Sequence, residues 1–127
     1  MEKGFIKGLA HIGIFVKDME ASKDYYVKLG FSLDKEAKLD DLELAFLSAG
    51  TCLIELVKLK DYVERPAGVI DHIAVEVDDI DAAVANATAK GINIDASAVT
   101  FVQLLGGIKN VFFEGPDGER IEYFEYC

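Results

Sequence analysis

An internal repeat organises this chain. When the sequence is shifted along itself by 61 positions, residues 11–21 align with residues 72–82, and Gly30 aligns with Gly91. Each copy begins with apolar residues in alternation, which is typical of a strand, and continues with a helical pattern that ends at a glycine. The repeat therefore predicts that a single β-α unit is built twice.

The remaining elements follow in the same order in both halves. The first helix is expected over about 19–29, with Asp18 as its N-cap and Gly30 at its end, and the second over about 80–90. Further strands are predicted at 31–38, 42–48 and 51–59, and again at 92–96, 108–114 and 119–126, with a hairpin turn at 115–118. Each half is thus βαβββ, and we expect one α+β domain over 1–127 made of two repeats, about 8–59 and 69–127.

The charge of the chain excludes several classes of partner. Acidic residues outnumber basic ones by 23 to 13, for a net charge of −10, which repels phosphate backbones and anionic lipids. No apolar stretch approaches the roughly 20 residues of a membrane helix, and we find no signal-peptide core. We therefore expect a cytoplasmic protein that binds a small molecule and binds neither nucleic acid nor membrane.

Two histidines and two glutamates fall on a face of the predicted sheets that the helices do not cover. In a strand, successive side chains alternate between faces, so His11 lies opposite the buried residues that follow it, and His72 repeats this. Glu55 and Glu122 are placed in the same way, each within an Ile-Glu pair of an apolar strand. The chain has only these two histidines, and both occupy the same position of the repeat.

A divalent metal would account for all four side chains. A carboxylate among apolar neighbours is costly unless a partner compensates it. Histidine nitrogens and carboxylate oxygens suit Zn, Ni, Co, Mn or Fe, and four protein ligands leave a position for water or substrate. Taken singly, a strand histidine is more often a hydrogen-bonded residue and a strand glutamate more often faces solvent. Because the pattern is repeated, the sequence predicts metal ligands at His11, Glu55, His72 and Glu122.

Other polar or reactive side chains are interpreted as structural. The carboxylates of Glu76, Glu125, Asp40 and Asp41 are expected to be solvated charges because they have no repeat partner of the same type. Cys52 is expected in the core. The segment 97–110 is long enough to close over a cleft as a lid, and a packed loop or a dimer contact are its alternatives.

In order and spacing, these motifs resemble the vicinal oxygen chelate superfamily, which includes glyoxalases and methylmalonyl-CoA epimerase. The motifs are Ala10-His11-Ile12-Gly13-Ile14, Tyr25-Tyr26, Lys28-Leu29-Gly30-Phe31, Ile54-Glu55-Leu56, Asp71-His72-Ile73-Ala74 and Gly115-Pro116-Asp117-Gly118-Glu119-Arg120-Ile121-Glu122. The resemblance implies two βαβββ modules that form an incomplete barrel around a metal-binding cleft, commonly in a homodimer.

The motifs are specific to the superfamily rather than to one activity, and their pattern is most similar to metal-dependent glyoxalase I, the lactoylglutathione lyase. It implies that His11, Glu55, His72 and Glu122 hold a divalent ion, with Ni or Zn as the first candidates and Co, Mn or Fe also compatible. It further implies isomerisation of a metal-chelated hemithioacetal, formed from a 2-oxoaldehyde such as methylglyoxal and a thiol, through an enediolate. Glu122 would take the proton from carbon, and Glu55 would return it or serve the opposite face.

The sequence departs from glyoxalase I where that enzyme holds glutathione. A basic residue is typical at the position of Phe15 and an amide is typical within 57–59, and neither is present, so the thiol is left open. Two alternatives remain, an acyl-CoA epimerase of the methylmalonyl-CoA type and a non-catalytic drug-binding or resistance module. An extradiol dioxygenase uses two histidines and one carboxylate, which the fourth ligand, Glu55, disfavours.

Overall fold

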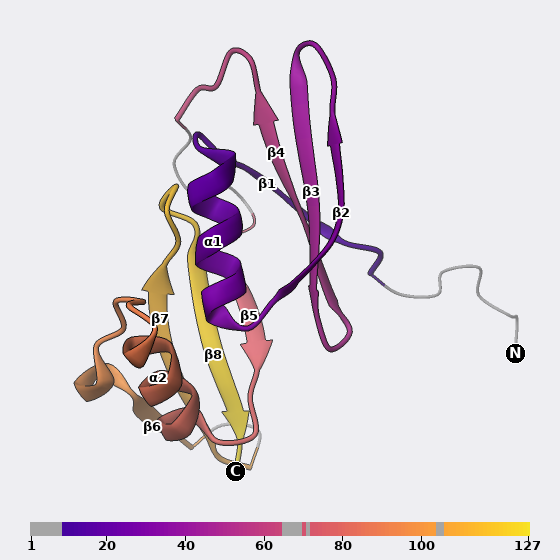
Figure 1. Cartoon of the computed structure of the whole chain (residues 1–127). Coiled ribbons are helices and arrows are strands. Elements are labelled where there is room, and N and C mark those ends of the chain that lie inside the picture. The colour runs from indigo at the N-terminus through magenta and orange to yellow at the C-terminus, as the bar shows by residue number, and fades with distance from the viewer. Residues whose placement is uncertain (1–8, 65–69, 71, 104–105) are drawn as a thin grey trace, which may run out of the picture.

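The two halves of the repeat form two similar modules in the computed structural model, which describes residues 9–64, 70, 72–103 and 106–127 (Figure 1). The first module contains β1 (Ile12–Phe15), α1 (Met19–Leu29), β2 (Ser32–Lys38), β3 (Leu42–Ala49) and β4 (Cys52–Leu59). The second contains β5 (Ile73–Glu76), α2 (Ile80–Ala89), the 3-10 helix η1 (Ala96–Ala98), β6 (Thr100–Val102), β7 (Ile108–Glu114) and β8 (Arg120–Tyr126). The predicted α+β class with two βαβββ modules is confirmed, and the sheets are not closed into a barrel.

Both sheets have the same topology. The strand orders are β1-β4-β3-β2 and β5-β8-β7-β6, and the first strand of each module pairs in parallel with the last. The register places Gly13 opposite Glu55 in one sheet and Ala74 opposite Glu122 in the other. Each histidine precedes its strand by one residue, so this register brings each histidine near the glutamate of its own module.

Alternation along the strands separates a core face from an open face. Ile14 and Val16 are buried, whereas His11 and Phe15 are exposed, as the sequence pattern predicted. The buried side chains of both modules join in one apolar core. Burial of apolar surface at roughly 25 cal/mol per Å² is the main stabilising term, and it fixes which face of each sheet remains open.

The predicted helix ends agree with the structure. Asp18 accepts a hydrogen bond from the backbone nitrogen of Ala21 at 3.1 Å, and Gly30 ends α1 with a φ of 124°, a conformation that favours glycine. Asp79 caps α2 in the same way through the nitrogen of Ala82, also at 3.1 Å. The second helix ends at Ala89, one residue before the predicted boundary. No helix in the described ranges is long and apolar enough to cross a membrane.

The strand predicted at 92–96 is wrong. Ile92 and Ile94 are buried, but the segment belongs to no strand of the described chain. Asp95 accepts hydrogen bonds from the nitrogen and hydroxyl of Ser97 and turns the backbone into η1, so β6 pairs with β7 instead. Alternating apolar residues report burial, and burial here does not require a strand partner. The described residues of the segment 97–110 lie in η1, β6, the start of β7 and their connections, and β6 is exposed along its length, so the lid stays a prediction.

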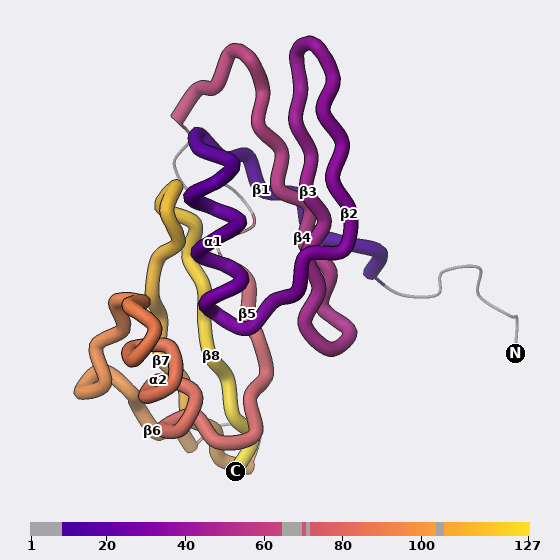
Figure 2. Tube along the Cα trace, viewed as in Figure 1, coloured from indigo at the N-terminus to yellow at the C-terminus, as the bar shows by residue number. Residues whose placement is uncertain are grey.

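The modules are joined by contacts between α1 and the β7–β8 turn. α1 packs on the first sheet, and the β7–β8 turn of the second module reaches its other side (Figure 2). The Tyr26 hydroxyl donates to Glu119 Oε2 at 3.0 Å, and the backbone nitrogen of Lys17 donates to Asp117 Oδ1 at 2.9 Å. Burial raises the pKa of Glu119 and of Tyr26. These contacts set the position of one module relative to the other.

Candidate metal centre

The first histidine and the first glutamate form a pair on the open face of the first sheet. His11 Nε2 lies 3.4 Å from Glu55 Oε1. Phe46 is the register partner of Glu55 on β3, and its ring meets the His11 ring edge to face at 5.6 Å between centroids. The side chains of His11 and Glu55 are 40% and 20% exposed, so this first pair is accessible to a ligand.

The second module repeats this arrangement with its own residues. His72 Nε2 lies 3.3 Å from Glu122 Oε1, with side-chain exposures of 35% and 7%. Phe112 is the register partner of Glu122 on β7, and its ring meets the His72 ring edge to face at 5.2 Å. The repeat in the sequence therefore corresponds to a repeat in the structure, in which each module holds a histidine, a glutamate and a phenylalanine in the same arrangement. The phenylalanines hold the imidazole rings by contact.

The two glutamates differ in their surroundings. Asn110 Nδ2 donates to Glu122 Oε2 at 2.8 Å, so one carboxylate oxygen faces the amide and the other faces His72. On β7, Asn110 is the register partner of Phe124, which follows Glu122 by two residues. The corresponding residue of the first module is Leu44 on β3, whose register partner Val57 follows Glu55 by two residues. The sequence interpretation missed Asn110. The signal that could have revealed it is a lone amide on β7, two residues before Phe112 and thus on the same face.

The structure places the four predicted ligands in two pairs rather than in one cluster. The first pair, His11 and Glu55, belongs to one sheet, and the second pair, His72 and Glu122, belongs to the other. Within the described residues, no three or more histidine, cysteine, aspartate or glutamate side chains lie close enough to hold a metal ion. The donor types fit a divalent metal, since each pair supplies one imidazole nitrogen and one carboxylate oxygen. Each pair is half of the predicted ligand set.

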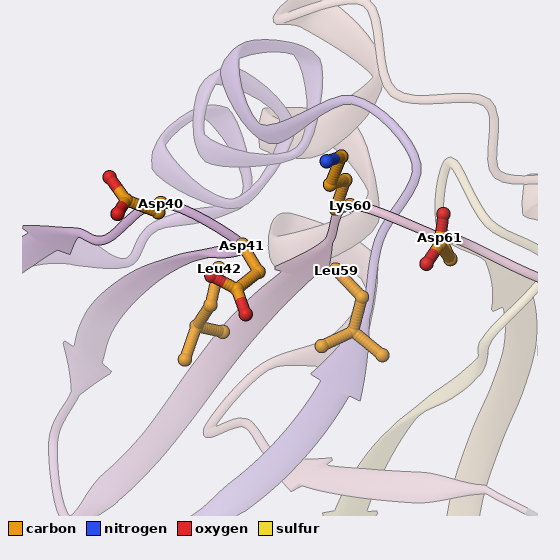
Figure 3. Close-up of a pocket in the computed structure, with 6 residues that line it drawn as sticks. All are labelled: Asp40, Asp41, Leu42, Leu59, Lys60 and Asp61. Carbon is orange, nitrogen blue, oxygen red and sulfur yellow. The ribbon is translucent and has the colours of Figure 1, made fainter.

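The other carboxylates do not join either pair. Asp40 and Asp41 line an open hollow with Leu42, Leu59, Lys60 and Asp61, where β3 begins and β4 ends (Figure 3). Both aspartates and Glu76 are exposed, as expected for solvated charges. Glu125 is more than a solvated charge, because its Oε1 accepts a hydrogen bond of 2.7 Å from the nitrogen of Ile80 at the start of α2. This contact anchors α2 to the end of β8.

Cys52 is partly buried against the core, which agrees with the sequence interpretation. Burial raises the pKa of its thiol and so disfavours the thiolate. The side chain is therefore suited to packing rather than to metal binding or nucleophilic chemistry.

Comparison with known proteins identifies the family. The model of the Glyoxalase/Bleomycin resistance protein/Dioxygenase superfamily matches residues 8–123. The uncharacterized protein YwbC of Bacillus subtilis is 33% identical over 125 residues, which cover 94% of this chain and 98% of YwbC. The chain therefore belongs to this superfamily, whose members include both enzymes and resistance proteins.

Solved structures share the fold. The glyoxalase family protein of Enterococcus faecalis matches with a TM-score of 0.81 and 26% identity, over 96% of this chain and all of the other. A glyoxalase I mutant from Zea mays matches with a TM-score of 0.75 and 23% identity, over 92% of this chain and 44% of the maize chain. At that identity the maize enzyme shows the likeness of fold alone.

Proposed function

We propose that this protein is a metal-dependent enzyme of the glyoxalase I type, which isomerises a hemithioacetal or a related α-hydroxycarbonyl compound. The observation that carries the proposal is the repeated His–Glu pair, with 3.4 Å between His11 and Glu55 and 3.3 Å between His72 and Glu122. Membership of a superfamily that includes glyoxalases supports the same conclusion. A binding module without metal chemistry would not need two such pairs on open faces.

The four side chains have separate roles in this proposal. His11, Glu55, His72 and Glu122 would hold a divalent ion, which when bound would stabilise negative charge on two neighbouring substrate oxygens. Glu122 takes the proton from the carbon that bears the hydroxyl group; the electron pair of that C–H bond forms the carbon–carbon double bond of the enediolate, and the π pair of the neighbouring carbonyl moves onto its oxygen. Glu55, which is more exposed, passes a proton from water to the neighbouring carbon, the hydroxyl proton moves to the oxygen of that carbon, and Glu122 releases its proton to water. Asn110 fixes the orientation of Glu122 through its 2.8 Å hydrogen bond.

We further propose that a second copy of the chain completes the site. The two pairs lie on different sheets, and within the described residues they do not form one cluster. In a two-fold dimer, the first pair of one protomer would meet the second pair of its partner, and symmetry would generate two equal sites. His11, Glu55, His72 and Glu122 would then supply each ion with two nitrogen and two oxygen ligands, and both modules would stay intact.

Metal content tests the proposal directly. The wild-type protein, purified without chelator and reconstituted with Ni, Zn, Co or Mn, is expected to bind about one ion per chain. His72→Ala and Glu55→Ala should each lower this content, whereas Glu76→Gln, which removes an exposed carboxylate of β5, should not. Retained metal in both ligand variants would reject the assignment of ligands. Absence of bound metal from the wild type would favour a ligand-binding module instead.

A further inference from the structure

An arginine lies on the open face of the second sheet beside the second pair. Arg120 precedes Glu122 by two residues on β8, so the two side chains leave the strand on the same face. The Arg120 guanidinium carbon lies 4.4 Å from the centre of the Phe112 ring, a cation–π contact. The same ring contacts His72 at 5.2 Å, so Phe112 touches both the guanidinium and the imidazole.

Along the described strands of the first module, no arginine corresponds to Arg120. The residue two positions before Glu55 is Leu53, and Phe46 has Lys35 as its register partner on the far strand β2. Lys35 is exposed and is separated from β4 by the whole of β3. Within the residues that the structure describes, a cation in contact with the phenylalanine of a pair and an amide bonded to its glutamate are therefore found on the Glu122 side and not on the Glu55 side.

We propose that Arg120 determines substrate specificity by binding a carboxylate that lies next to the two oxygens of the substrate that bind the metal. This inference rests on the proposed metal site. It assigns the substrate to a class, small hydroxy or oxo compounds that carry one carboxylate beyond their chelating oxygens. It also orients them, with that carboxylate toward β8.

The chemistry of arginine supports this assignment. The guanidinium is always charged and presents its donors in a plane that matches the two oxygens of a carboxylate. Stacking on Phe112 restricts the rotation of that plane, so less conformational entropy is lost when an anion binds. In a chain of net charge −10, a cation held beside the ligands would offset the repulsion of an anionic substrate.

Glu114 supplies an internal competitor. It is the register partner of Arg120 across the β7–β8 ladder, so both side chains lie on one face. A carboxylate of the substrate would compete with Glu114 for the guanidinium. Replacing Glu114 by glutamine should therefore strengthen the binding of an additional carboxylate.

Binding of two probes to the metal-loaded protein tests the proposal. Glycolate and tartronate both chelate a metal through a hydroxyl and one carboxylate oxygen, and tartronate carries one further carboxylate. Calorimetric titration should show tartronate binding more tightly to the wild type. Arg120→Met should lower the affinity for tartronate by about tenfold, as expected for the loss of a partly exposed charged hydrogen bond, and should change the affinity for glycolate by less than about twofold. Arg120→Lys should recover part of the loss because it restores the charge.

The controls separate this inference from the proposed function. Lys35→Met removes a cation from the corresponding face of the first module and should change the affinity for neither probe. Glu114→Gln should raise the affinity for tartronate and leave that for glycolate unchanged. Metal content is measured on every sample. If Arg120→Met keeps its full metal content but loses affinity equally for tartronate and glycolate, Arg120 has only a structural role and the inference is overturned. Unchanged affinity of Arg120→Met for tartronate would also overturn it. Loss of metal from the wild type itself would overturn the proposed function, and the inference with it.

Discussion

Mixing two inactive variants tests whether the metal site forms between two copies of the chain. One variant carries His11→Ala with Glu55→Ala and so lacks the first pair. The other carries His72→Ala with Glu122→Ala and lacks the second pair. In a symmetric dimer of either variant alone, both sites retain only two of four ligands, and we expect little metal and no isomerase activity.

The mixture has a defined expected value. If the chains reassort at random, about half of the dimers contain one chain of each kind. In each such dimer one site combines the two intact pairs, and the other combines the two removed pairs. The mixture should therefore hold about a quarter of the wild-type metal and show about a quarter of its activity per chain. A site formed within one chain predicts no recovery at all, because every chain lacks one pair.

The assay needs proof that heterodimers form and that the variants fold. Native mass spectrometry resolves the heterodimer if one variant carries an affinity tag of different mass, and metal is then measured on the separated species. Loss of Glu122 leaves the Asn110 amide without its 2.8 Å acceptor, at a cost of about 1–3 kcal/mol, so circular dichroism must show the native fold first. Folded heterodimers without metal would refute the shared site. Full metal in either variant alone would refute the choice of ligands.

Two further predictions concern single carboxylates. Glu122→Gln keeps the shape of the side chain but removes the proposed base, so the isomerisation rate of a methylglyoxal hemithioacetal should fall by roughly 10²- to 10⁴-fold, and unchanged turnover at full metal occupancy would disprove the role of the base. The Glu119 carboxyl group accepts hydrogen bonds from the Tyr26 hydroxyl and the nitrogen of Asp117. Burial raises the pKa of Glu119 above its value in the unfolded chain. Its contribution to stability is therefore present in acid and is lost as the pH rises through the folded pKa. Urea titrations of the wild type and of Glu119→Gln at pH 5 and pH 7 measure the difference between their free energies of unfolding. This difference should favour the wild type more at pH 5 than at pH 7, and the opposite order would contradict this account.

The repeat and the strand alternation predicted much of the candidate site from the sequence. Both are local properties, and they were sufficient to place all four side chains on the open faces of the sheets, whereas the pairing of His11 with Glu55 and of His72 with Glu122 is seen only in the structure. The sequence did not reveal the separation of the two pairs, because that depends on how the modules dock. The docking is set by contacts such as Tyr26 to Glu119, which join residues 93 positions apart and follow no periodic pattern. The strand predicted at 92–96 failed for a related reason, since Ile92 and Ile94 are buried without a strand partner.

The departures from the repeat indicate where the two pairs have different tasks. The modules share a histidine, a glutamate and a phenylalanine at matching positions, and the histidine and the glutamate are the donors of the proposed metal site. Residues that differ gather around Glu122, where Asn110 replaces Leu44 and Arg120 replaces Leu53. A proton acceptor needs a fixed carboxylate, and a bound anion needs a fixed cation, and in the described part of the chain both are found on the Glu122 side. The asymmetry therefore favours Glu122 over Glu55 as the base, on grounds independent of family resemblance.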